Sequence, residues 1–193
     1  MRKLLAISGK RFSGKDTLAG LLQRHALAAG RSLEAHAFAA ESKRLFVEAR
    51  RAAGVDVDLG RLTNDRAYKE RLRPELTRFT VDAIARDPLV FCRAVADRIA
   101  ASASPPLVTD LRLRLEIEHL SSRFDLHVVR LLRPDAHRAA SGWRHDPAAD
   151  GHPTETELDD PSLWHEAVAN DGTLAQLDAK AAALVAAFFS PRP

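Results

Sequence analysis

The sequence predicts an α/β fold in which a parallel sheet of about five strands lies between layers of helices. Short apolar runs, too brief for helices, alternate along the chain with longer segments whose apolar residues recur at helical spacing. Glycine, proline and aspartate punctuate these segments, as they do in strand–helix–strand units. The 193 residues suit a single domain, 1–193, with enough chain to bury a core.

The first strand is expected at residues 3–8, and a glycine-rich turn follows it. The turn has the pattern G-x-x-x-x-G-K and reads Gly9, Lys10, Arg11, Phe12, Ser13, Gly14, Lys15, Asp16. Glycine permits backbone angles at which successive N–H groups face inward, and a helix that begins near Lys15 adds the positive end of its dipole. Such a turn binds the phosphates of a nucleotide, with Lys15 reaching the β- and γ-phosphates.

Two aspartates are candidate Mg²⁺ ligands. Asp16 stands where the pattern usually has a serine or threonine that binds the ion. Its carboxylate could act through water, or the neighbouring Thr17 could contribute. Asp110 follows a short apolar strand, and carboxyl ends of parallel strands face one crevice. Asp110 is therefore expected beside the glycine turn, as an Mg²⁺ ligand, as a helix N-cap, or as both.

The remaining elements follow from the same patterns. Further strands are expected at 33–38, 107–109, 126–132 and 167–169, and helices at 41–51, 65–85, 87–101 and 174–188. Residues 54–60 are expected to form a loop, and Leu113, Ile117 and Leu120 to share a helix face. The buried face of the 65–85 helix is expected to carry Tyr68, Leu72, Leu76, Phe79 and Ala83.

Two prolines and one polar segment modify this outline. Pro74 should kink or split the 65–85 helix, and Pro88 should occupy the first turn of the next helix. Residues 133–162 are rich in Pro, Gly, Asp, His and Ala, which is typical of a mobile excursion outside the core.

Composition limits the partners. The net charge of +3 comes from 29 Lys and Arg against 26 Asp and Glu, without a dense basic run, so no nucleic-acid partner is expected. The single cysteine, Cys92, excludes an internal disulfide and fits a reducing compartment. The apolar run behind the basic start is too short for a signal peptide or membrane span. A cytoplasmic monomer without a membrane partner is expected.

Clustered arginines and lysines leave two interpretations open. Lys69 and Arg73 lie four residues apart on one helix face, which is either solvated or part of a pocket for an anionic acceptor. Arg133, Arg138 and Arg144 lie in the polar excursion, which is either a surface loop or a flap that closes over a phosphoryl group. The histidines there match no compact zinc pattern, and no G-x-S-x-G motif supports a serine hydrolase.

Several segments, in order, resemble the animal-type phosphomevalonate kinases, which are small P-loop enzymes of the nucleoside-monophosphate-kinase architecture. The matching segments are residues 8–11, 13–16, 68–70 (Tyr-Lys-Glu), 87–88 (Asp-Pro), 91–93 (Phe-Cys-Arg), 107–108 with Asp110 and Arg112, 142–143 (Gly-Trp), and Asn170 with Gly172. The resemblance implies a three-layer P-loop kinase fold, with a helical acceptor-binding region at about 40–100 and a mobile lid at about 133–162.

The resemblance also implies an activity. It implies transfer of the γ-phosphoryl group of ATP, with Mg²⁺, to (R)-5-phosphomevalonate, which gives 5-diphosphomevalonate in the mevalonate pathway of isoprenoid biosynthesis. The implied catalytic residues are Lys10, Lys15, Asp110 and Arg112. The implied nucleotide contacts are residues 9–17, Arg138, Asn170 and Asp171. The implied acceptor contacts are Lys69, Arg73, Arg93, Arg112 and Asn170, and the implied metal ligands are Asp16 and Asp110.

Departures from the family pattern fall on the acceptor and lid side. Leu113, the pair Ala83-Ile84, and Ser141 stand where the family tends to carry basic residues. Residues 170–174 also resemble the strand-to-helix junction of deoxynucleoside-monophosphate kinases. A nucleoside-monophosphate kinase, or a kinase of another small phosphomonoester, is therefore the alternative. A non-catalytic P-loop module is a weaker one, because the chain lacks the Asn/Thr-Lys-x-Asp guanine motif.

Overall fold

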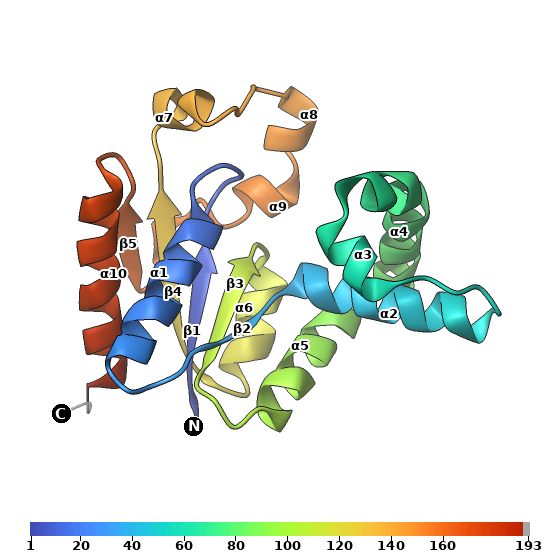
Figure 1. The fold of residues 1–193 in the computed structure, drawn as a ribbon, viewed down its shortest axis with the longest axis horizontal. Helices are drawn as coiled ribbons and strands as arrows, with labels where there is room; N and C mark the ends of the chain where they lie inside the picture. The colour runs from blue at the N-terminus through green and yellow to red at the C-terminus, as the bar shows by residue number, and fades with distance from the viewer. Residues whose placement is uncertain (191–193) are drawn as a thin grey trace.

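The computed structural model, described here for residues 1–190, is built on a parallel five-stranded sheet. Its strand order is β2-β3-β1-β4-β5, and every neighbouring pair is parallel (Figure 1). The strands are β1 (Lys3–Ser8), β2 (Glu34–His36), β3 (Pro106–Leu111), β4 (Asp125–Leu132) and β5 (Glu166–Ala169). The predicted α/β class and its parallel sheet are confirmed.

Helices cover both faces of the sheet, because the residues of the strands alternate between two cores. Leu4 and Ala6 of β1 pack in one core with α5 (Val90–Ala101) and α6 (Arg114–Ser121). Leu5 and Ile7 pack in the other with α1 (Lys15–Ala28) and α10 (Leu174–Phe189) (Figure 1). Successive side chains of a strand point to opposite faces of the sheet, and here both faces are buried under helices. This arrangement gives the three layers that the sequence predicts.

A helical region stands beside the sheet and has a small core of its own. It consists of α2 (Phe38–Ala52), α3 (Leu59–Asn64) and α4 (Arg66–Arg86) (Figure 1). Phe46, Val47, Val57 and Leu62 are buried there. The predicted apolar face of α4 packs against them through Tyr68, Leu72, Leu76 and Phe79.

Two local predictions in this half of the chain are wrong, and for Pro74 one of its two predicted effects is excluded. The expected loop at 54–60 ends early, because the Asp58 side chain caps α3 by accepting from the Arg61 N–H at 2.9 Å. Pro74 does not split α4, which continues for 21 residues; its fixed φ suits a helix, and one backbone hydrogen bond is lost. Pro88 precedes α5, because the Asp87 carboxylate accepts from the Leu89 N–H at 3.1 Å and forms a turn there.

The segment 133–162 lies over the carboxyl ends of the strands and contains short helices (Figure 1). These are α7 (Asp135–Ala140), α8 (Pro147–Asp150), α9 (Pro153–Thr156) and the 3₁₀ helix η1 (Pro161–Leu163). The last three begin with proline after a side chain that caps the first turn. The prediction that this segment stays outside the core is wrong for Leu158, which is 1% exposed and packs in the α5–α6 core.

Among the described residues, every helix is too short or too polar to cross a membrane.

Candidate active site

The glycine-rich turn between β1 and α1 needs glycine at two positions. A Cβ atom at Gly9 would lie 2.8 Å from the carbonyl oxygen of Leu131, so β4 can approach only a glycine there. Gly14 has φ 96° and precedes α1, and a Cβ atom on it would lie 2.7 Å from Nδ2 of Asn170. That same Nδ2 donates to the Ser13 carbonyl at 2.8 Å, so Asn170 fastens the turn to the end of β5.

Lys15 is buried inside the turn and held by its backbone. Its Nζ donates to the carbonyl oxygens of Gly9 at 2.6 Å and Lys10 at 2.9 Å. Burial, and then the positive charge of Arg112, lower the pKa of Lys15 to about 8. An anion bound beside Lys15 would therefore raise the pKa of its ammonium group again and would be attracted to the charge.

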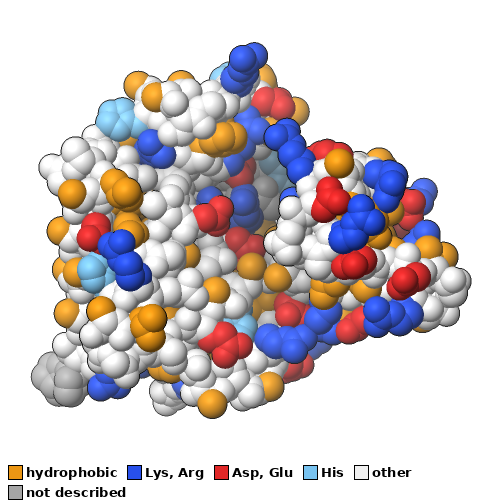
Figure 2. All heavy atoms as spheres, viewed as in Figure 1, with side chains coloured by type: hydrophobic (Ala, Val, Ile, Leu, Met, Phe, Trp, Pro, Cys, Tyr) orange, Lys and Arg blue, Asp and Glu red, His pale blue; other side chains and the backbone are white. Residues whose placement is uncertain are grey.

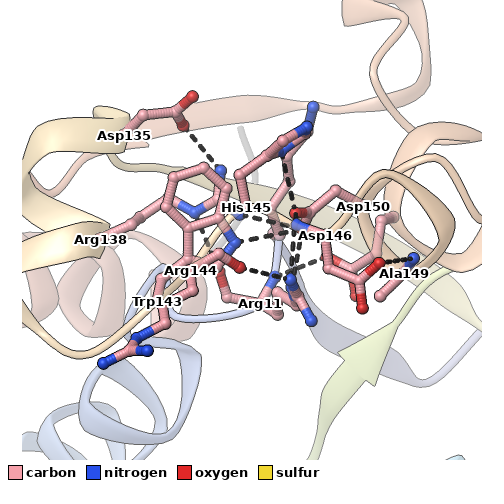
Figure 3. A network of polar contacts seen from close by, with 12 residues as sticks. Arg11, Asp135, Arg138, Trp143, Arg144, His145, Asp146, Ala149 and Asp150 are labelled. Carbon is pink, nitrogen blue, oxygen red and sulfur yellow. Dashed lines mark hydrogen bonds and ion pairs between the residues drawn. The ribbon is translucent and has the colours of Figure 1, made fainter.

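Side chains of the segment 133–162, called the lid below, form a network of polar contacts with Arg11 (Figure 3). The Asp150 carboxylate accepts from Arg11 Nε at 2.7 Å and from Trp143 Nε1 at 3.1 Å. The buried Arg138 donates from Nε to the Arg11 carbonyl at 3.0 Å, and its guanidinium lies 4.0 Å from the centre of the Trp143 ring. Hydrogen bonds from Arg11, the Asp146 backbone and Trp143 hold the pKa of Asp150 well below its usual range.

Two more lid carboxylates contact the predicted catalytic residues. Glu155 is buried and accepts from the backbone N–H of Arg11 at 2.6 Å, and it also pairs with Nη1 of Arg112. Asp159 lies 2.8 Å from Nζ of Lys10 and pairs with Arg130. Carboxylates of the lid therefore pair with Lys10, Arg112 and the Arg11 N–H group, which the sequence predicts to contact phosphate groups.

Predicted site residues line cavities beside the turn and beside the helical region. A cavity of about 430 Å³ is lined by Lys10, Ser13, Arg130, Leu131, Leu132, Arg133, Pro134, Asp135, Arg138, Asp159, Trp164, Ala169 and Asp171. Four predicted nucleotide contacts therefore share one cavity: Lys10, Ser13, Arg138 and Asp171. Within residues 1–190 the Ser13 hydroxyl is buried without a hydrogen-bond partner.

The second cavity, of about 720 Å³, lies between the helical region and the lid, where Figure 2 shows the molecule hollowed. Lys43 and Lys69 bring positive charge to it, and Leu76, Val81 and Ile84 bring an apolar wall. The predicted acceptor contact Lys69 lies here. Arg73 and Arg93 do not line it; Arg73 Nε pairs with Glu70 at 2.7 Å, and Arg93 pairs with Asp87.

The candidate metal ligands Asp16 and Asp110 belong to different elements, α1 and β3, and differ in their surroundings. Asp110 lies within β3 rather than after it, and its carboxylate accepts from the N–H groups of Phe38 at 2.8 Å and Ala39 at 3.0 Å. It thus caps α2 instead of the helix that follows it, and burial raises its pKa. Asp16 and Thr17 are exposed in the first turn of α1. Over the described part of the chain, no three His, Cys, Asp or Glu side chains are grouped so that they could hold a metal ion between them.

Sequence reasoning missed Lys43, Arg130, Glu155 and Asp159. Lys43 could have been found, because it lies in the first turns of the helix after β2, at the edge of the sheet where ligands bind. The other three carry no local signal, since each acts through a contact with a residue more than twenty-five positions away.

The parallel sheet and the G-x-x-x-x-G-K turn that follows its central strand define the fold of a P-loop kinase. The fold is similar to that of a sugar kinase from Janibacter (TM-score 0.55, 15% identity, 99% of this chain and 100% of that one). It is also similar to the APS kinase of Mycobacterium tuberculosis in complex with AMPPNP and APS (TM-score 0.54, 13% identity, 98% of both chains).

The sequence comparisons identify the family. The phosphomevalonate kinase family model matches residues 7–126. The phosphomevalonate kinase of Drosophila melanogaster is 30% identical over 183 residues, which are 91% of this chain and 92% of the fly protein. The chain belongs to the phosphomevalonate kinase family, as the resemblance of its motifs predicts.

Proposed function

We propose that this protein transfers the γ-phosphoryl group of ATP to the phosphate of (R)-5-phosphomevalonate and so supplies 5-diphosphomevalonate to isoprenoid biosynthesis. Family membership supports the substrate. The observation that carries the chemistry is the convergence of Lys15, from the turn after β1, and Arg112, from the end of β3. Glu155 bridges the two regions, because it accepts from the Arg11 N–H of the turn at 2.6 Å and pairs with Nη1 of Arg112. The charge of Arg112 also helps to lower the pKa of Lys15.

The reaction needs charge neutralisation more than a covalent catalyst. Lys15 and the N–H groups of the turn would bind the β- and γ-phosphates. Arg112 would release the Glu155 carboxylate and bind the phosphoryl group that is being transferred. It would then stabilise the negative charge that develops on that group in the transition state. The attacking atom is an oxygen of the acceptor phosphate, which is already an anion and needs no strong base.

Mg²⁺ would neutralise the phosphates when it is bound with the nucleotide. Asp16 fits this task better than Asp110, because its carboxylate is exposed in the first turn of α1 beside Lys15. The two oxygens of Asp110 already accept from the α2 backbone. Mg²⁺ commonly binds one or two carboxylates, with waters and phosphate oxygens as its other ligands.

The acceptor would occupy the cavity between α2, α4 and the lid. Lys43 and Lys69 suit the two anionic groups of phosphomevalonate, and the apolar wall suits its branched carbon skeleton. The Ser42 and Thr80 hydroxyls on the cavity wall are hydrogen-bonded to each other at 2.8 Å, and Thr80 donates to the Leu76 carbonyl, so they could accept a hydrogen bond from a hydroxyl group of the acceptor.

A panel of acceptors tests the proposal. Purified protein with Mg-ATP should release ADP when phosphomevalonate is added, and should do so slowly or not at all with nucleoside monophosphates. Turnover of a nucleoside monophosphate without turnover of phosphomevalonate would favour the nucleotide-kinase alternative. ATP binding without acceptor-dependent ADP release from any phosphomonoester would favour a binding module.

A further inference from the structure

Arg130 is a buried cation beside the phosphate-binding turn. It lies on β4, directly opposite Ser8, the last residue of β1 before the turn. Its side chain is 5% exposed. Nη1 donates to the Ser8 hydroxyl at 2.8 Å, and Nε has no hydrogen-bond partner within the described residues. A guanidinium this deep normally requires a full set of acceptors, so the missing one calls for an explanation.

The only carboxylate paired with Arg130 in residues 1–190 belongs to the lid and is shared. Asp159 pairs with Nη2 of Arg130 through one oxygen and with Nζ of Lys10 through the other, at 2.8 Å. The Asp159 side chain is 42% exposed, in contrast to the arginine that it neutralises. A partly solvated carboxylate on a segment of short helices is a replaceable partner for a cation fixed in the sheet.

Arg130 lines a cavity with other cations, and this cavity can hold an anion larger than one carboxylate. Arg130 opens on the 430 Å³ cavity together with Lys10, Ser13 and Arg133. Its charge is also felt at Lys15 and at Glu155. Asp159 pairs with Lys10 and Arg130, and Glu155 pairs with Arg112, so both carboxylates neutralise cations near the turn. The Arg130 charge acts on both carboxylates, so these cations together suit an anion with linked acidic groups, such as the phosphates of a nucleotide.

We propose that Arg130 binds phosphoryl oxygens of the nucleotide, and that Asp159 occupies this position until the nucleotide enters. The inference rests on the proposed nucleotide site and adds a residue to it. The Ser8 hydroxyl holds the guanidinium in place, and its planar fork suits a phosphate as well as it suits a carboxylate. Lys10, released from the same carboxylate, would bind beside it.

Binding of AMPPNP, measured by calorimetry, tests this role without any acceptor. Arg130→Met should weaken AMPPNP binding about 10- to 100-fold, as expected for a buried hydrogen bond to a charged group, and Arg130→Lys should weaken it less. Asp159→Asn should leave the affinity unchanged or raise it. Arg123→Met is the matched control, because Arg123 pairs with Asp97 at 2.7 Å on the surface and should bind AMPPNP normally.

Thermal unfolding without nucleotide separates binding from a purely structural role. A structural arginine would lower the unfolding temperature of Arg130→Met and leave the AMPPNP affinity of the folded protein unchanged, and that result would overturn the proposal. Should Arg130→Met fail to fold, unchanged affinity in Arg130→Lys, or weaker binding by Asp159→Asn, would overturn it equally. Failure of the wild-type protein to bind AMPPNP would instead contradict the proposed function, and this assignment with it.

Discussion

The phosphate-binding turn is closed mainly by bonds to its own backbone carbonyls, whereas the acidic residues of the lid contact the site mainly through ion pairs. Within the turn, Ser13 N–H donates to the Lys10 carbonyl at 3.1 Å, and Lys15 closes the loop on two more carbonyls. The lid reaches the same place through Asp150, Glu155 and Asp159, each of which pairs with a cation outside the lid. The local hydrogen bonds keep the turn in its shape without a ligand. The ion pairs of the lid, in contrast, are contacts that a phosphate group can replace.

The largest effect should come from the turn itself. Lys15→Ala should lower turnover by about three orders of magnitude or more, because a preorganised charge on the transferring phosphates is removed. The fold should persist, since burial makes this charge costly in the native state. Steady-state ADP release and thermal unfolding measure both effects.

Lys3→Ala is the control for that substitution. Lys3 donates to the Phe188 carbonyl at 3.0 Å at the opposite end of β1, so turnover should stay normal. Full activity in Lys15→Ala would mean that the turn does not carry the reaction.

Arg112 joins the two regions and should give the next largest effect. Its side chain pairs with the lid residue Glu155, while its backbone N–H donates to Glu116 at 2.6 Å in the core. Arg112→Ala should lower kcat by about two to three orders of magnitude, as expected for a donor aimed at transition-state charge. A change confined to KM would instead make Arg112 a contact that binds ground state and transition state equally.

Arg114→Ala serves as the neighbouring control. Arg114 also faces the lid, through Asp160 at 3.3 Å, but both side chains are largely exposed. We expect less than a threefold change in kcat, because an exposed ion pair contributes only about 0.2–1 kcal/mol.

These residues also show which parts of the fold and the site can be predicted from the sequence. The turn could be predicted because glycine spacing and backbone N–H groups act within eight consecutive residues. The sheet could be predicted from its short apolar runs. Arg130 could not, because one arginine in an apolar strand gives no sign of Ser8 opposite it. The pairing of Glu155 with Arg112 depends on a chain path of 43 residues, which local patterns do not determine.

Glu155→Gln should weaken the lid without damaging the turn. The carboxylate competes with phosphate for Arg112 and for the Arg11 N–H group. Its neutralisation should therefore tighten AMPPNP binding several-fold, measured by calorimetry. Glu157→Gln is the control, because Glu157 accepts from the Arg114 N–H at 2.9 Å, away from the turn. Weaker AMPPNP binding by Glu155→Gln would show that the carboxylate supports the site rather than occupies it.

The smallest effect on turnover, and a distinct effect on stability, should follow from Glu116→Gln. Glu116 is buried, and its Oε2 accepts from the backbone N–H groups of Arg112 and Leu113, at 2.6 and 3.1 Å. Burial raises its pKa from the ordinary value of 4.5 to about 8. The native state then holds a proton that the unfolded chain releases, so wild-type stability should fall as pH rises from about 4.5 to about 8, by up to about 1.4 kcal/mol per pH unit from this group.

Glutamine mimics the protonated acid and cannot titrate, so the variant should lose this part of the pH dependence. Urea unfolding at pH 5, 6.5 and 8 should show the free energy of unfolding of Glu116→Gln gaining on that of the wild type as pH rises. Turnover at pH 7 should change little, because the wild-type side chain is already mostly protonated there and Arg112 keeps its backbone anchor. A large loss of turnover with unchanged stability would mean that the core, and not the lid, sets the position of Arg112. Parallel pH curves for the two proteins would mean that Glu116 is ionised in the native state, with its two N–H donors outweighing the cost of burial.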